Sequence, residues 1–170
     1  MKFIHSILCL SILFIGCQPK PDNSVNETFE KNSKTVLSYL EGFQNESLDY
    51  SVFYSKDFVM RRTNFGSKDS INLEELISKD MDAWEKYDFE LVTSPVNLLP
   101  GVDIDTKLPD GSVRYYGDWK VTLPKTDSTE AKSGVINLYE SFGFDEEGKI
   151  LFQAYYGDES ALLMFLNSKE

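Results

Sequence analysis

One carboxylate in this sequence stands where it could do acid-base chemistry. Over 134–144, apolar residues recur at every second position, as on one face of a β-strand. Glu140 falls on this apolar face. Its neighbours on that face are Ile136, Leu138, Phe142 and Phe144. A carboxyl group removed from water resists ionisation, so its pKa moves toward the range useful for proton transfer. Glu140 is therefore the candidate catalytic residue. The simpler interpretation is an ion pair with Arg61, Arg62 or Arg114.

Aromatic residues could supply the apolar walls and the hydroxyl donors of a binding site. They gather in segments predicted to form a sheet and in one helix expected to cover it. Tyrosine hydroxyls in a concave apolar site would orient a hydrophobic ligand through hydrogen bonds. The candidate ligand-binding residues are Arg61, Trp84, Tyr115, Trp119, Tyr139 and Tyr155. For the aromatic residues, core packing combined with a homodimer interface is the competing interpretation, and both can hold on opposite faces of one sheet.

The scarce reactive side chains narrow the chemistry further. The 170 residues include one histidine, His5, and two cysteines, Cys9 and Cys17. His5 and Cys9 lie in an apolar N-terminal run that looks removable, which would leave a chain without histidine. Histidine triads, metal sites built from His or Cys, and internal disulfides are then excluded. Segment 103–107 begins like a calcium loop, but Lys107 stands at a ligand position. We expect no metal and no cofactor.

Helices are predicted to precede the strands. From Glu27 to about Phe43, apolar residues fall on one face of an amphipathic helix, and a short helical segment follows at 48–54. The clearest helix covers 72–88, where apolar residues recur at spacings of three and four and Asn72 with Glu75 has capping-box spacing. Its polar face is assigned to Glu74, Glu75 and Asp80.

The second half of the chain changes to a period of two. Strands are predicted at 113–123, 134–144 and 149–156, separated by turn-forming residues, as in an antiparallel meander. Three N-terminal helical segments followed by a strongly curved antiparallel sheet make an α+β layout, with the helices covering one face. The length suits one domain, which we assign to residues 27–170.

The order of elements and the segment from Leu48 to Val59, LDYSVFYSKDFV, resemble the nuclear transport factor 2-like (SnoaL-like) superfamily. The resemblance implies a cone-shaped domain in which helices close a curved sheet around a pocket. Its members include ketosteroid isomerase, scytalone dehydratase, polyketide cyclases and non-catalytic binding domains, so the fold assigns no reaction. In isomerase-like members a carboxylate base follows the strand matching 58–60. Here Arg61 and Arg62 stand at that place, and a guanidinium stays protonated.

This departure favours a non-catalytic domain that binds a small apolar ligand or a protein partner. An isomerase- or dehydratase-like enzyme using Glu140 and tyrosine donors is one alternative. A structural dimerisation module of an envelope complex is another. The three differ in whether the interior holds a cavity and whether Glu140 faces it.

The N-terminal residues predict the location of the protein in the cell. A positive start, Met1-Lys2, precedes an apolar run over 3–15 that is shorter than the roughly 20 residues of a spanning helix. The end of this run, Phe14-Ile15-Gly16-Cys17, resembles the lipobox of bacterial lipoproteins. The resemblance implies a signal peptide at 1–16, acylation of Cys17 and a membrane anchor. With Gln18 after the cysteine, it also implies sorting to the outer membrane of a bacterial cell envelope.

The residues after Cys17 and the overall charge complete this prediction. Segment 17–26 is rich in Pro, Asn, Asp and Ser and is predicted to be a flexible tether. The formal charge is −11. It becomes more negative by one when Lys2 leaves with the signal peptide. Such a chain repels phosphates, so nucleic acid is not expected as a partner.

Overall fold

A long helix opens the described part of the chain, residues 24–127 and 129–168 of this computed structural model. Helix α1 (Ser24–Gln44) begins within the predicted tether, because residues 24–26 add nearly one turn, and Glu27 then lies in the first turn, where a negative charge is favourable. The predicted signal peptide, Cys17 and residues 18–23 lie outside the described residues. Within those residues, no helix has both the length and the apolar character needed to span a membrane.

Two shorter helices follow, each with a side-chain cap. Asp49 caps α2 (Tyr50–Phe53) by accepting a hydrogen bond from the backbone N–H of Ser51 at 3.0 Å. In α3 (Leu73–Trp84), Asn72 accepts from the Glu75 N–H at 2.9 Å, and the Glu75 carboxylate accepts from the Asn72 N–H at 3.3 Å. This confirms the predicted capping box. The helix ends at Trp84, earlier than predicted.

Seven strands form one curved sheet, in the order β2-β1-β7-β6-β5-β3 with β4 also paired to β5. The bounds are β1 (Tyr54–Arg61), β2 (Ser70–Ile71), β3 (Asp88–Leu91), β4 (Asn97–Val102), β5 (Pro109–Leu123), β6 (Lys132–Phe144) and β7 (Ile150–Tyr156). The predicted meander is confirmed in β5, β6 and β7. The sheet is mixed and not wholly antiparallel as predicted, because β1 runs parallel to β7. These strands are far apart in sequence, so only the tertiary fold sets their direction.

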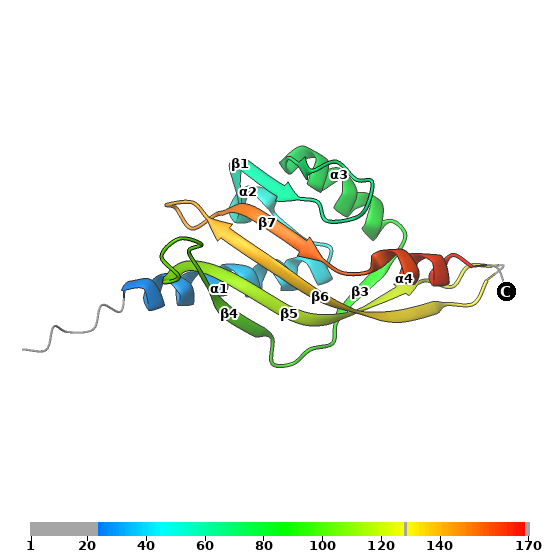
Figure 1. The fold of residues 1–170 in the computed structure, drawn as a ribbon. Helices are drawn as coiled ribbons and strands as arrows, with labels where there is room; N and C mark the ends of the chain where they lie inside the picture. The colour runs from blue at the N-terminus through cyan, green and yellow to red at the C-terminus, as the bar shows by residue number, and fades with distance from the viewer. Residues whose placement is uncertain (1–23, 128, 169–170) are drawn as a thin grey trace, which may run out of the picture.

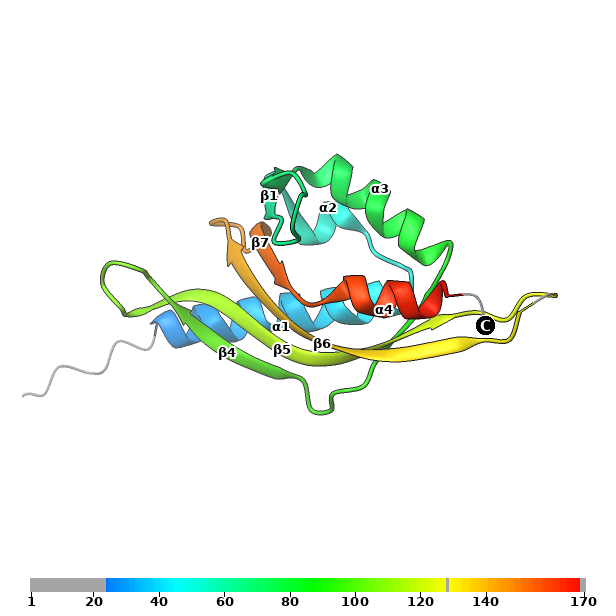
Figure 2. The ribbon, with the colours of Figure 1, turned by 45° about the vertical axis from the view of Figure 1, so that its right-hand side comes forward.

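The helices pack on the inner side of the bend in the sheet (Figure 1). A fourth helix, α4 (Glu159–Leu166), was not predicted, because apolar residues surround it and leave no amphipathic pattern. Asp158 caps it, and it packs against β6. Figure 2 shows α4 between α3 and the sheet. The architecture is thus the predicted α+β layout with one more helix at the C-terminal end.

Close packing on the inner face depends on one glycine. Tyr115 is fully buried and leans along β5 over Gly117. A Cβ atom at position 117 would lie 2.0 Å from the Tyr115 hydroxyl oxygen, which no side chain tolerates. Gly117 therefore allows the ring of Tyr115 to lie flat on the sheet, between its own position and that of Trp119, four residues further along the same face.

Candidate functional site

A cavity of about 460 Å³ lies between the inner face of the sheet and helices α1, α3 and α4. This volume falls within the range of about 300–1,000 Å³ that is usual for small-molecule pockets. Most of its wall is apolar. Representative lining residues are Leu40, Phe43, Met60, Leu76, Ile136 and Leu138. An apolar molecule placed here would be largely removed from water.

Glu140 lies on the wall of this cavity and is only 4% exposed. Its carboxylate accepts a hydrogen bond of 2.6 Å from the side-chain amide of Gln153 on β7. Tyr54 donates to the carbonyl oxygen of the same amide at 3.2 Å, and the amide also donates to the Tyr39 hydroxyl at 3.4 Å. This chain of hydrogen bonds fixes the position of the carboxyl group.

No arginine neutralises Glu140. Arg61 and Arg114 lie on the outer face of the sheet, since Met60 and Tyr115 beside them point inward. Among the described residues, neither these arginines nor Arg62 forms an ion pair. The predicted ion pair between Glu140 and an arginine is therefore not formed among the described residues. Burial raises the pKa of Glu140 to about 7, the Gln153 hydrogen bond opposes this, and the charge of Asp80 adds to it.

Asp80 is a second buried carboxyl group on the same cavity. It lies on α3, is 9% exposed and accepts a hydrogen bond of 2.9 Å from the Tyr50 hydroxyl. Burial raises its pKa to about 7, although the Tyr50 hydrogen bond lowers it. The sequence pattern placed Asp80 on the solvent face, which is wrong. Its spacing of four from both Leu76 and Trp84 could have revealed the inward position.

Three buried hydrogen-bond donors lie at the cavity or in the core near it. The Trp119 indole N–H, the Tyr115 hydroxyl and the Trp84 indole N–H are buried and make no hydrogen bond of normal geometry within the described residues. Trp119 lines the cavity. Burial raises the pKa of Tyr115, and the nearby Glu140 raises it further, whereas Trp119 lowers it. The Trp119 N–H makes only a weak hydrogen bond to the Tyr115 hydroxyl, so it could donate to a ligand oxygen at this end of the cavity.

The structure brings together three of the seven predicted catalytic and ligand-binding residues. Glu140, Trp119 and Tyr155 line the cavity. Arg61 does not, and its neighbour Arg62 lines the cavity instead. Trp84 packs behind the wall with its ring centre 5.4 Å from that of Phe43. Tyr115, although fully buried, is not among the lining residues.

Tyr139 lies on the outer face of the sheet. Its ring contacts Tyr116 and Tyr156, with centroid distances of 4.9 and 5.6 Å. These three tyrosines, here called the outer tyrosine row, are directly paired across β5, β6 and β7. Sequence reasoning grouped the aromatic residues correctly on the sheet but could not separate its two faces, because β5 and β6 carry aromatic residues on both.

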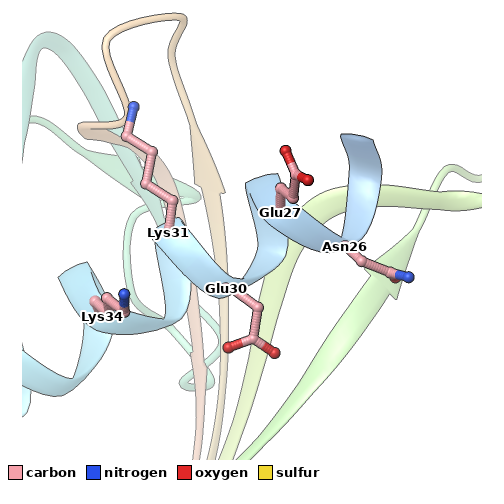
Figure 3. A pocket seen from close by; sticks show the side chains of 5 residues that line it. All are labelled: Asn26, Glu27, Glu30, Lys31 and Lys34. Carbon is pink, nitrogen blue, oxygen red and sulfur yellow. The ribbon is translucent and has the colours of Figure 1, made fainter. Parts of the chain in front are cut away.

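A second hollow, of about 530 Å³, lies beside the first turns of α1 and is lined by residues of this helix alone. All five lining residues, Asn26, Glu27, Glu30, Lys31 and Lys34, are exposed. Their side chains leave one helix in several directions and do not converge (Figure 3). Glu27 with Lys31 and Glu30 with Lys34 have the spacing of stabilising surface pairs. We therefore interpret this hollow as solvated helix surface.

No group of three or more metal-ligating side chains occurs in the part of the chain that the structure describes. The cavity itself holds two buried carboxyl groups, those of Glu140 and Asp80. Tyrosine hydroxyls, amides and indoles surround them, which can donate hydrogen bonds but bind metals weakly.

Searches against models of known families and against curated proteins find no match. Solved structures do share the fold. A Xanthomonas campestris protein assigned as a polyketide cyclase aligns with a TM-score of 0.58 at 16% identity, covering 82% of this chain and 96% of that one. A Burkholderia xenovorans nuclear transport factor 2-like protein gives 0.58 at 12% identity, covering 81% and 97%. An epoxide hydrolase of M. tuberculosis gives 0.54 at 16%, covering 81% and 90%.

The chain therefore has the nuclear transport factor 2-like (SnoaL-like) fold that the segment 48–59 and the order of elements predicted. Identities of this size establish the fold alone. Function depends on the residues of the cavity.

Proposed function

We propose that the domain binds a small, largely apolar molecule in the cavity and that Glu140 transfers a proton to or from it. The observation that carries this proposal is a buried carboxyl group on the cavity wall with a fixed position and no cationic partner. Such a group destabilises a folded protein compared with an apolar residue of similar size. A pKa of about 7 leaves both of its protonation states populated near neutral pH, which suits a general acid or base.

The surrounding groups support a reaction at a carbon next to a carbonyl. Ionised Glu140 would accept the proton from that carbon while the electron pair of the C–H bond moves toward the carbonyl oxygen. The Trp119 N–H, or protonated Asp80, would donate a hydrogen bond to that oxygen as its negative charge develops. Return of the proton to a different carbon completes an isomerisation. The proteins of this fold include one assigned as a polyketide cyclase and one named an epoxide hydrolase.

Binding is tested with a fluorescent apolar probe, N-phenyl-1-naphthylamine. We expect saturable binding to the purified protein. A83W should weaken it at least tenfold, because Ala83 lines the cavity and the indole would occupy the space of the probe. A131W is the matched control, since Ala131 is exposed and outside the cavity. Equal affinities for the two variants and the unaltered protein would contradict a binding cavity.

Proton transfer is tested with 5-nitrobenzisoxazole, a small apolar substrate. A base removes its ring C–H proton, the electron pair forms the nitrile, and the N–O bond breaks to release a coloured phenolate. We expect an accelerated rate that rises with pH around 7, where Glu140 ionises. E140Q should lower this rate at least tenfold and bind the probe normally. E147Q, on an exposed turn, controls for the loss of one charge.

Binding without chemistry is the second candidate, and the hydrogen-bond chain around Glu140 favours it. Gln153, Tyr54 and Tyr39 give the carboxyl group a structural role that needs no substrate. Retention of the benzisoxazole rate in E140Q, together with tight probe binding, would support this candidate over the first. Either result leaves the cavity as the site of function.

We propose further that Cys17 is acylated and anchors the domain to the outer membrane of a bacterial cell envelope. The support is the lipobox-like sequence before Cys17 and the polar residues after it. Expression with an alkyne analogue of palmitate should label the protein, and C17S should abolish the label. C9S should keep the label, because Cys9 lies inside the predicted signal peptide. Labelling that survives C17S would overturn the anchor.

A further inference from the structure

The cavity opens between α3, the chain after β1, and the start of α4. Five charged side chains line it there. They are Arg62, Lys79, Asp82, Lys86 and Glu159. Lys79, Asp82 and Lys86 are exposed, whereas Arg62 and Glu159 are half-buried. Because exposed residues that line a cavity must stand at its opening, these side chains define the mouth.

The cations at the mouth form no close ion pair within the described residues, although the charge of Lys79 helps to lower the pKa of Glu75 on the same helix. Within the described residues, none of Arg62, Lys79 and Lys86 forms an ion pair. Glu159 is already engaged, since it accepts hydrogen bonds from Asn64 at 3.4 Å and from the Tyr155 hydroxyl. Of the two carboxylates at the mouth, Asp82 is then the one without a hydrogen bond or ion pair in the described part of the chain, beside three cations. A local positive excess is unexpected in a chain with a formal charge of −11.

The interior has the opposite character. Below the mouth, the wall is apolar and holds the buried carboxyl groups of Glu140 and Asp80. A negatively charged group placed deep in the cavity would be repelled by these carboxylates and would lose its hydration. At the mouth, the same group would meet the fork of Arg62, which matches a carboxylate, and two ammonium groups.

We propose that the cavity selects molecules with an apolar body and one terminal carboxylate, which Arg62, Lys79 and Lys86 hold at the mouth; this inference rests on the proposed binding function. The apolar body then extends inward, so its reactive carbon lies at Glu140 and its charged end stays in contact with solvent. The three cations thereby set both the ligand class and the direction in which the ligand enters.

The test compares two probes that differ only in this group, 1-pyrenebutyrate and 1-pyrenebutanol. We expect the carboxylate to bind about tenfold more tightly than the alcohol, as charge-assisted hydrogen bonds provide. The variant R62Q/K79Q/K86Q should lose this preference and bind the two probes with similar affinity. The control R61Q/K34Q/K56Q removes the same charge from exposed residues outside the cavity and should keep the preference.

The outcomes separate the two proposals. If both pyrene probes and N-phenyl-1-naphthylamine fail to bind, the binding function is wrong and this inference falls with it. If the two pyrene probes bind equally well, or the control variant loses the preference as fully as the mouth variant, only the selection of carboxylates is overturned. Circular dichroism of each variant verifies that the fold is intact.

Discussion

Glu140 and Asp80 are buried carboxyl groups whose pKa values both lie at about 7. Their ordinary values are 4.5 and 3.8. Desolvation is the main cause in both cases, and hydrogen bonds from Gln153 and Tyr50 reduce the shift without cancelling it. The same burial that makes these groups useful for proton transfer also makes the folded state sensitive to pH.

The pH dependence of stability follows from the direction of the shift. Below pH 4.5, Glu140 is protonated in both the folded and the unfolded chain. Between pH 4.5 and about 7, the folded chain binds more protons, so the free energy of unfolding falls as the pH rises and then levels off. This fall amounts to roughly 3 kcal/mol for Glu140 alone.

E140Q should therefore show a smaller loss of stability across this pH range, with the contribution of Asp80 remaining. Urea unfolding at several pH values measures this loss of stability. E147Q is the control, because it removes one negative charge from an exposed residue. An unchanged pH dependence in E140Q would mean that Glu140 is not the group that titrates.

Gly117 provides a second test at the scale of single residues. G117A should destabilise the protein by about 1–3 kcal/mol, because its Cβ would overlap the Tyr115 ring and force it out of place. G143A is the matched control, since its Cβ would lie 3.4 Å from that of Phe152, an ordinary contact. Comparable urea midpoints for the two variants would show that Tyr115 can move at little cost.

At the scale of elements, α4 closes one side of the cavity. Glu159, Leu162 and Leu163 line it, while Leu166 at the end of the helix is 1% exposed and fastens the helix to the domain. Met164, by contrast, is 76% exposed. The helix is therefore held by few buried side chains, of which Leu166 is the most completely buried.

L166A should cost about 2–4 kcal/mol of stability, as is usual for truncating a buried leucine. M164A should change stability by less than about 0.5 kcal/mol, because its side chain remains in solvent. Thermal or urea unfolding of both variants makes the comparison. L166A should also weaken binding of N-phenyl-1-naphthylamine if α4 moves away from the cavity. Equal stability of the two variants would contradict the role of Leu166.

At the scale of the whole molecule, the two faces of the sheet have different surroundings. The inner face contributes to the core and the cavity, whereas the outer face carries the outer tyrosine row, with Tyr116 45% and Tyr156 43% exposed. Phe152 and Val59, paired between β7 and β1, are also exposed. Aromatic residues in such a group on a sheet surface favour contact with another protein surface.

We expect this face to form a homodimer. Sedimentation equilibrium should give the mass of two chains, and Y116S/Y139S/Y156S should give the mass of one while binding the naphthylamine probe normally. S133A/N137A changes exposed residues of β6, the strand that carries Tyr139, without removing aromatic rings and should remain dimeric. A mass of one chain for the unaltered protein would contradict the homodimer.

Local patterns in the sequence determined much of the fold. The capping box at Asn72, the alternation that puts Glu140 on the apolar face, and the turns between β5, β6 and β7 each depend on residues close in sequence. Such features follow from backbone geometry and local hydrogen bonds, and they can be read from the chain. Helix α4 was not predicted, because its apolar residues lie on all sides and show no helical periodicity.

Only the tertiary structure decided what surrounds Glu140. Its partner is Gln153 and not an arginine, because β7 brings the amide alongside β6 while Arg61 and Arg114 point to the outer face. The parallel pairing of β1 with β7 and the inward position of Asp80 were likewise decided by contacts between distant segments. The sequence determined that a carboxyl group would sit among apolar residues. Its pKa and its access to a cavity depend on desolvation by the whole fold, which no local pattern encodes.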